Sequence, residues 1–269
     1  MLNTRVIAQK FHESHKFLTK TSLKILNNDL LLAIVVAIIL LLIGVVLGYE
    51  NVQKIPITHA TTELYQLEPK NKLSFMSNWD GPIYINIAKN GYSKVSLANF
   101  FPLYPLLINI VNKLISSSLY SALLVAWVSL IGAIYFYLKV VKQFLKIKLN
   151  SEAVRALLLF ILFPSAVFML ASFTESLFAF LSLAAIYYAM KNRYLVAAIF
   201  GMFATATRPT GVFLILLVAL ILFENRTKLL KIYTGIIIGM LGILSYMIFL
   251  YIKYGNPMEF VVTQKGHVA

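Results

Sequence analysis

The sequence of 269 residues contains no cysteine and few histidines, and each shortage excludes a class of function. Without cysteine the chain has no disulfide, no thiolate nucleophile and no cysteine-ligated metal. The 4 histidines lie outside the long apolar segments, so neither a proton relay nor a metal site built from histidine is expected inside a membrane. No glycine-rich phosphate-binding loop is present, so no nucleotide cradle is predicted.

The chain is rich in apolar residues. Hydrophobic residues make up 60% of it and the mean hydropathy is +0.82, while charged residues are 13%, about half the soluble norm. This composition predicts an all-α protein that crosses a membrane several times. The net charge of +14 follows from the Lys and Arg that membrane proteins place on cytoplasmic loops, so no nucleic-acid partner is expected.

Apolar stretches predict about seven crossings. The first, residues 30–47, follows a basic leader and is too long for the apolar core of a cleaved signal peptide. The others are 119–138, 153–171, 176–190, 194–206, 210–223 and 232–252. Segment 101–115 is short and carries two prolines, so an interfacial or re-entrant helix is predicted there. The predicted domains are a cytoplasmic segment, 1–29, and a membrane domain, 30–269, whose first outer loop is 50–118.

The basic residues predict the orientation. If residues 1–29 are cytoplasmic, most of the 24 Lys and Arg fall in the short cytoplasmic segments, and the longer outer segments hold the minority. The positive-inside rule therefore predicts a multi-pass protein with a cytoplasmic N-terminus. In this topology the first outer loop and the turns at 172–175 and 207–209 all face the outer side.

Three ionisable residues at the predicted outer surface are candidates for chemistry. Asp80 precedes Pro82, and the i, i+4 apolar spacing that follows predicts a short interfacial helix, so the alternative for Asp80 is a helix N-cap. Glu175 and Arg208 lie in tight turns between apolar helices, where ionisable groups are costly and usually functional. Arg208 needs a partner, and the candidates are Glu175, Asp80 or a phosphate. The alternatives are a first-turn Glu that complements a helix dipole and a snorkelling Arg.

Other residues give weaker signals. Tyr92 and Lys94 are minor candidates in the first outer loop. The spacing of Gly235 and Gly239 indicates helix packing rather than phosphate binding.

Around these residues the sequence resembles the PIG-V-like mannosyltransferase family of the class C glycosyltransferases. The ordered set of motifs covers about residues 79 to 266, and it is more specific than any one of them. The motifs are Trp79-Asp80 with Gly91-Tyr92, Phe100-Phe101-Pro102-Leu103-Tyr104-Pro105, Phe163-Pro164 with Thr174-Glu175-Ser176, Ala206-Thr207-Arg208-Pro209-Thr210-Gly211, and Gly255-Asn256-Pro257 with Phe260 and Gln264. Family members continue with more helices beyond Ala269, so a fragment or truncated member is expected.

The resemblance implies a class C glycosyltransferase bundle that moves a sugar, with inversion, from a polyprenyl-phosphate donor to a lipid-linked or surface acceptor. It implies that Asp80 is the base, and Arg208 is then expected to stabilise the leaving phosphate. Glu175 is expected to orient the acceptor or hold Arg208. Aromatic residues are expected to line the sugar or lipid groove, the alternative being an ordinary aromatic belt. These are Trp79, Tyr84, Tyr92 and Tyr104.

Two further classes of function stay open at this point. A transporter or flippase should show internal repeats and charges at mid-membrane, and neither is evident. A non-catalytic membrane subunit is the other alternative. For the enzyme, the expected partners are membrane lipids, the polyprenyl-phosphate sugar and a glycan or lipid acceptor. No resident cofactor is expected, and a divalent metal is left open.

Overall fold

The computed structural model describes residues 29–48, 50, 73–145, 151–161 and 163–266, and every regular element in these ranges is a helix. The predicted all-α class is therefore confirmed. The basic leader and residues 51–72 of the predicted outer loop lie outside the described residues.

Three described helices are long and apolar enough to cross a membrane: Asp29–Gly48, α5 (Ser118–Leu145) and α10 (Leu229–Tyr254). Four shorter apolar helices accompany them. These are α4 (Leu103–Ile115), α7 (Glu175–Met190), α8 (Tyr194–Thr205) and α9 (Gly211–Glu224). The structure is a helical membrane bundle, and the count of seven crossings stays a prediction.

The predicted crossing at 153–171 is not one continuous helix. Helix α6 (Ser151–Ile161) ends before a 3-10 segment, η4 (Pro164–Met169), and Phe163 between them has an extended backbone. Proline lacks an N–H and disfavours the α conformation in the residue before it, so the helix ends at this point. The high hydropathy of residues 153–171 therefore does not reveal where the helix ends.

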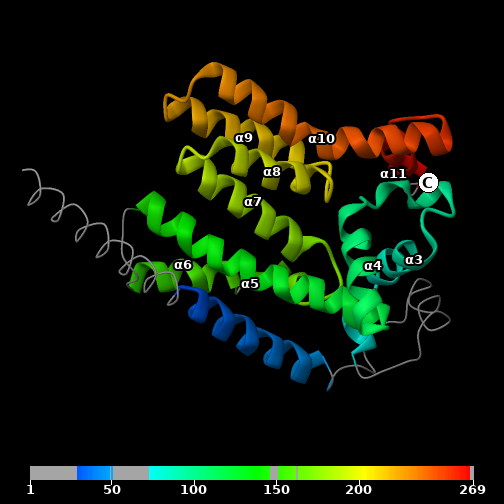
Figure 1. Cartoon of the computed structure of the whole chain (residues 1–269). Helices are drawn as coiled ribbons and strands as arrows, with labels where there is room; N and C mark the ends of the chain where they lie inside the picture. Colours follow the sequence, from blue (N-terminus) through cyan, green and yellow to red (C-terminus); the bar gives the residue numbers. More distant parts are fainter. Residues whose placement is uncertain (1–28, 49, 51–72, 146–150, 162, 267–269) are drawn as a thin grey trace, which may run out of the picture.

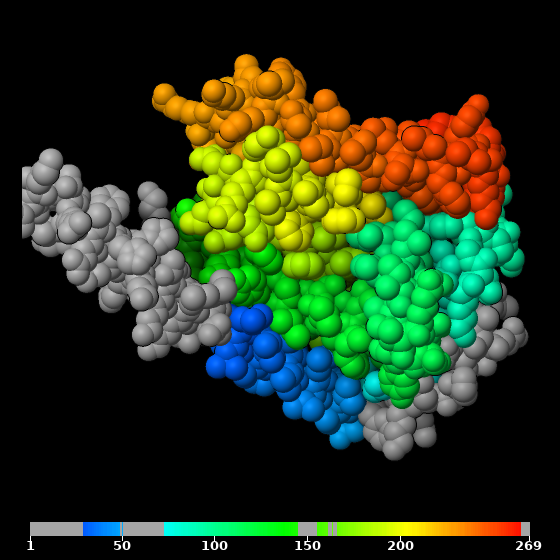
Figure 2. Space-filling view, viewed as in Figure 1, coloured from blue at the N-terminus to red at the C-terminus, as the bar shows by residue number. Residues whose placement is uncertain are grey.

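The bundle is built in sequence order. Helix α5 packs on α7, α7 on α8, and α8 on α10, while α9 packs against α7, α8 and α10. The short helices α3 (Gly81–Asn90), η3 (Val95–Asn99) and α11 (Glu259–Gly266) gather with α4 at one end of the bundle (Figure 1). Helix α11 packs directly on η3. The first helix lies at the outer edge, where residues such as Leu31 and Leu42 are exposed (Figure 2).

The opposite end of the bundle holds a buried ion-pair cluster. Asp29, only 1% exposed, pairs with Lys139 at 3.0 Å and with Lys142. The sequence analysis did not single out these two lysines. The structure adds that they attach the first helix to α5, because a buried carboxylate without a cation would be strongly unfavourable.

Helix α10 meets α8 through a close backbone approach at Gly242. A Cβ at Gly242 would lie 1.9 Å from the carbonyl oxygen of Met202 and 2.4 Å from Oγ1 of Thr205. Thr205 Oγ1 also donates to the carbonyl of Gly239 at 2.8 Å. The packing face of α10 thus runs through Gly239 and Gly242, whereas a Cβ at Gly235 would reach no heavy atom nearer than 4.0 Å.

This contact predicts opposite outcomes for two glycines of one helix. Gly242→Ala is expected to destabilise the protein by about 1–3 kcal/mol, because the backbone of α8 must move away. Gly235→Ala is the matched control and should be neutral or stabilising by up to about 1 kcal/mol, because alanine favours the helix and its Cβ would lie 4.0 Å from Cβ of Ala198, an ordinary van der Waals contact. Thermal unfolding in detergent measures both. Equal effects would contradict the packing described.

Candidate active site

The segment before α3, in the predicted first outer loop, is held to the turn before α7 by hydrogen bonds. The Ser172 backbone N–H donates to the Met76 carbonyl at 2.9 Å, and Ser172 Oγ donates to Ser77 Oγ at 2.7 Å. Gly81 packs directly against Ser172, because a Cβ at residue 81 would lie only 2.3 Å from Ser172 Oγ. These contacts therefore hold the segment that carries Asp80 next to the residues that precede Glu175, the first residue of α7.

Asp80 occupies the N-cap position of α3 but does not cap it. Its side chain makes no capping hydrogen bond, and Pro82 stands in the first turn of the helix. Capping therefore does not explain the carboxylate. The preceding Trp79 has φ of +51°, a left-handed conformation that is uncommon for a bulky residue and that gathers at functional sites.

Arg208 pairs with Glu175. Nη2 of Arg208 lies 2.9 Å from Oε1 of Glu175, and the side chains are 40% and 27% exposed. A backbone hydrogen bond attaches the turn that holds Arg208 to α4: the Leu103 N–H donates to the Ala206 carbonyl at 3.1 Å. In the part of the chain that is described, Nε and Nη1 of Arg208 make no hydrogen bond, so both can donate to a ligand.

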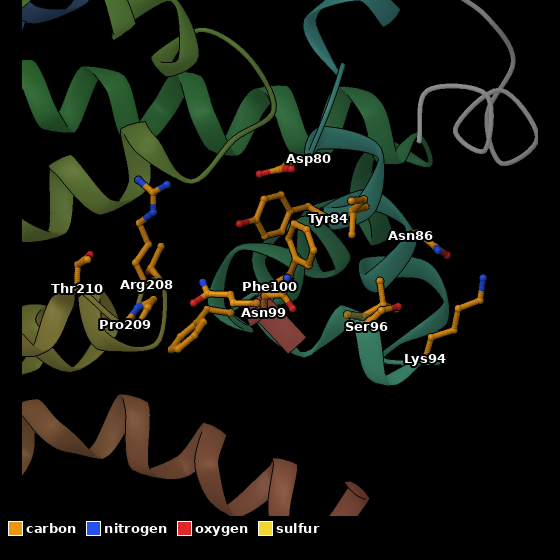
Figure 3. Close-up of a pocket in the computed structure, with 15 residues that line it drawn as sticks. Asp80, Tyr84, Asn86, Lys94, Ser96, Asn99, Phe100, Arg208, Pro209 and Thr210 are labelled. Atoms are coloured by element: carbon orange, nitrogen blue, oxygen red, sulfur yellow. The ribbon is translucent and has the colours of Figure 1, made fainter. Parts of the chain in front are cut away.

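Asp80 and Arg208 line one cavity of about 760 Å³ (Figure 3). Tyr84 lies between them, and its ring packs edge-on against Phe100 with centroids 5.2 Å apart. Asn86, Ser96 and Lys94 lie on the side away from Arg208 (Figure 3). Other polar groups that line the cavity are Asn99, Thr207, Thr210 and Gln264.

A second, mostly apolar groove of about 590 Å³ begins at the same arginine. It is lined by aromatic and aliphatic side chains from α5, α6, η4 and α7, together with Glu175 and Arg208. Among them are Leu159, Phe160, Phe163 and Phe178. Arg208 is thus shared by a polar cavity and an apolar groove, and the ion pair lies where they meet.

The environment of Asp80 strengthens it as a base. Burial raises the pKa of the Asp80 carboxyl above its ordinary value, the charge of Glu175 raises it further, and Arg208 lowers it. Burial also raises the pKa of the Tyr84 hydroxyl far above its ordinary value, so Tyr84 stays a neutral donor. A carboxylate with a raised pKa accepts a proton more readily than an ordinary aspartate.

The predicted aromatic residues separate in the structure. Of the four, only Tyr84 lines the Asp80 cavity. Tyr104 is fully buried beneath Tyr84, and its hydroxyl donates to the Ala122 carbonyl at 3.0 Å, so it is a core residue. Tyr92 lines a separate cavity, and Trp79, 49% exposed, packs edge-on against Phe168.

Comparison with known proteins identifies the family of the chain. A model of the mannosyltransferase (PIG-V) family matches residues 30–256. The chain belongs to this family. It is 31% identical over 148 residues to the human protein GPI alpha-1,6-mannosyltransferase 2, a match that covers 52% of this chain and 30% of the human protein. No solved structure matches the chain.

Several residues of the candidate site were not predicted from the sequence. Asn86, Ser96 and Asn99 all line the cavity, and the side-chain oxygen of Asn99 is buried with no hydrogen-bond partner among the described residues. Their signal was weak, because single polar residues in a polar loop look like solvated surface. Within the described residues, no three His, Asp or Glu side chains are grouped so as to bind a metal ion.

The charge of Glu175 predicts a shift in the pH profile. Activity that needs ionised Asp80 falls as the pH drops through its raised pKa. Glu175→Gln removes a negative charge that raises this pKa, so the acid limb of kcat should move to lower pH. Glu259→Gln is the control, because Glu259 lies at the same end and lines none of the three cavities described. An unmoved acid limb in Glu175→Gln would contradict the assignment.

Proposed function

We propose that this chain transfers a mannosyl group, with inversion, from a polyprenyl-phosphate donor to a hydroxyl of a lipid-linked or surface acceptor. Membership of the mannosyltransferase family supports a glycosyltransferase. The observation that carries the proposal is that Asp80 and Arg208 line one cavity while Arg208 also borders an apolar groove. A lipid-linked sugar phosphate has the matching order of groups: sugar, phosphate, hydrocarbon chain.

The proposed reaction is one displacement at the anomeric carbon. The acceptor oxygen forms a bond to this carbon as the bond from the carbon to the phosphate oxygen breaks. The acceptor proton passes to the carboxylate of Asp80. The electron pair leaves with polyprenyl phosphate, and the guanidinium of Arg208 compensates the charge that develops there.

The groove supports the donor class. Apolar side chains hold a hydrocarbon chain through dispersion contacts and leave no buried polar group without a hydrogen bond. Phe160 and Phe178 supply such a surface next to the arginine that would hold the phosphate. Glu175 holds one edge of Arg208 in place, so the free edge is presented to the phosphate.

The proposal is tested by assay of the full chain in lipid nanodiscs. Polyprenyl-phosphate β-mannose is supplied with a glycolipid acceptor, and the product linkage is read by NMR. An α-linked product is expected, since attack opposite the leaving group inverts the anomeric centre. A β-linked product would contradict the single displacement. Passage of labelled donor across a vesicle membrane without cleavage would support the transporter instead.

The proposed outer location of the site has its own test. The chain lacks cysteine, so single cysteines report without background. Ser93→Cys lies at the end of the bundle that carries the site, and Lys228→Cys lies in the turn between α9 and α10; both positions are exposed. A membrane-impermeant maleimide applied to intact cells should label only the first. The reverse pattern would place the site on the cytoplasmic side.

A further inference from the structure

One wall of the Asp80 cavity is a single short segment of the chain, residues 94–101, which contains η3 and is called the η3 wall below. Its polar and aromatic members that line the cavity are Lys94, Ser96, Asn99, Phe100 and Phe101. The helix in this segment is of the 3-10 type and only 5 residues long, and hydrogen bonds in 3-10 helices have poor geometry. The η3 wall therefore depends on contacts with other elements to keep its shape.

Helix α10 holds the end of the η3 wall through Tyr246. The Tyr246 hydroxyl donates to the Ala98 carbonyl at 2.7 Å and lies 3.3 Å from the Phe100 carbonyl. The Tyr246 ring packs on the ring of Phe101 with centroids 4.8 Å apart. Tyr246 is only 1% exposed and Ala98 is fully buried, so solvent does not replace this hydroxyl, and its loss leaves a buried carbonyl unpaired.

The same helix holds the beginning of the η3 wall through Tyr254. The Tyr254 hydroxyl lies 2.9 Å from the Tyr92 carbonyl and 3.0 Å from the Lys94 carbonyl, within donating distance of both. Tyr254 is partly exposed, so water is able to take over its hydrogen bonds. Helix α10 thus fixes both ends of the wall, and Tyr246 is the contact that solvent does not replace.

The proposed inversion places the acceptor next to this wall. An inverting displacement requires the attacking oxygen to approach from the side opposite the leaving group. The proposed leaving phosphate lies at Arg208, and in Figure 3 Asp80 and Tyr84 lie between Arg208 on one side and Ser96 and Lys94 on the other. The half of the cavity beside the η3 wall is therefore the half from which an acceptor approaches.

We propose that the η3 wall binds the acceptor sugar and that Tyr246 positions this wall. The proposal rests on the proposed function, since it takes the donor phosphate to lie at Arg208. A hydroxyl-rich sugar suits the wall, because Ser96 and Asn99 offer neutral hydrogen-bonding groups beside the ring of Phe100. Tyr246 itself does not line the Asp80 cavity, and it acts by fixing the carbonyls on both sides of Asn99.

Tyr246→Phe tests the positioning role, because it removes the hydroxyl and keeps the ring. The full chain is assayed in lipid nanodiscs with polyprenyl-phosphate mannose and with methyl α-mannoside as the acceptor probe. The KM for methyl α-mannoside should rise roughly 3- to 10-fold, which corresponds to the loss of one hydrogen bond. The KM for the donor, measured by its hydrolysis without acceptor, should not change. Tyr254→Phe should raise the acceptor KM less, because water replaces its hydroxyl.

Tyr104→Phe is the matched control. It also removes a buried hydroxyl that donates to a backbone carbonyl, that of Ala122, and neither residue lines the cavity. It should lower the melting temperature about as much as Tyr246→Phe does, yet leave the KM for methyl α-mannoside unchanged. Equal rises in both variants would mean general loosening of the fold. A raised donor KM with an unchanged acceptor KM in Tyr246→Phe would also overturn the proposal.

Hydrogen–deuterium exchange tests the wall without turnover. With no donor present, methyl α-mannoside should slow amide exchange in residues 94–101 of the wild type, and Tyr246→Phe should need a higher concentration for the same protection. Absent protection in the wild type, or equal concentrations for the two proteins, overturns the proposal. Protection without any sugar transfer would instead mean that the proposed reaction is wrong while the binding wall stands. If Tyr246→Phe does not fold, an unchanged half-protecting concentration in Tyr254→Phe overturns the positioning by α10.

Discussion

Asp80→Asn is expected to lower kcat for sugar transfer by roughly 100- to 10,000-fold, the range typical for loss of a general base. The amide keeps the size of the carboxylate but does not take up the acceptor proton. Because the Asp80 side chain makes no capping hydrogen bond, the fold should be retained. Initial rates with saturating donor and acceptor measure the effect, and the melting temperature checks the fold.

The outcome of this substitution also separates the functional alternatives. Glu259→Gln removes an acidic charge at the same end without touching the cavity, and it should leave kcat unchanged. An Asp80→Asn variant with wild-type kcat would show that Asp80 is not the general base. Loss of transport in a chain that never cleaves the donor would instead favour the transporter.

Arg208→Ala should produce the second large loss, about 100- to 1,000-fold in kcat, because the developing phosphate charge loses its cation. Arg208→Lys should retain more of the wild-type kcat than Arg208→Ala, but not all of it. Lysine keeps the charge but cannot hold Glu175 and a phosphate at once with a planar fork. Rates measured at several donor concentrations distinguish weaker donor binding from a slower chemical step.

A double variant separates structure from chemistry at Arg208. Arg208→Ala alone leaves the half-buried Glu175 without its cation, so part of its effect is structural. Arg208→Gln with Glu175→Gln removes both charges and should restore the melting temperature while activity stays low. If the double variant regains activity together with stability, Arg208 only positions Glu175 and does not act on the phosphate.

Much of the fold followed from local sequence. Apolar runs predicted the helices that the structure has at 29–48, α5 and α7 to α10, because the membrane demands long apolar segments with satisfied backbones. The prediction at 153–171 was wrong in one respect, since Pro164 interrupts the helix. Glu175 and Arg208 were found because a charge between apolar helices is rare and needs a reason.

The sequence by itself therefore determined the class of the protein, its helices and three ionisable residues with a reason to be functional. Only the tertiary structure decided which of them meet. Two backbone hydrogen bonds, Ser172 to Met76 and Leu103 to Ala206, bring together segments about a hundred residues apart, and no local pattern encodes them. The same packing forms the ion pair between Arg208 and Glu175. It also places Tyr84 in the cavity and Tyr104 in the core. Helix formation depends on neighbouring residues, whereas a site depends on contacts between distant ones, which exist only after the chain has packed.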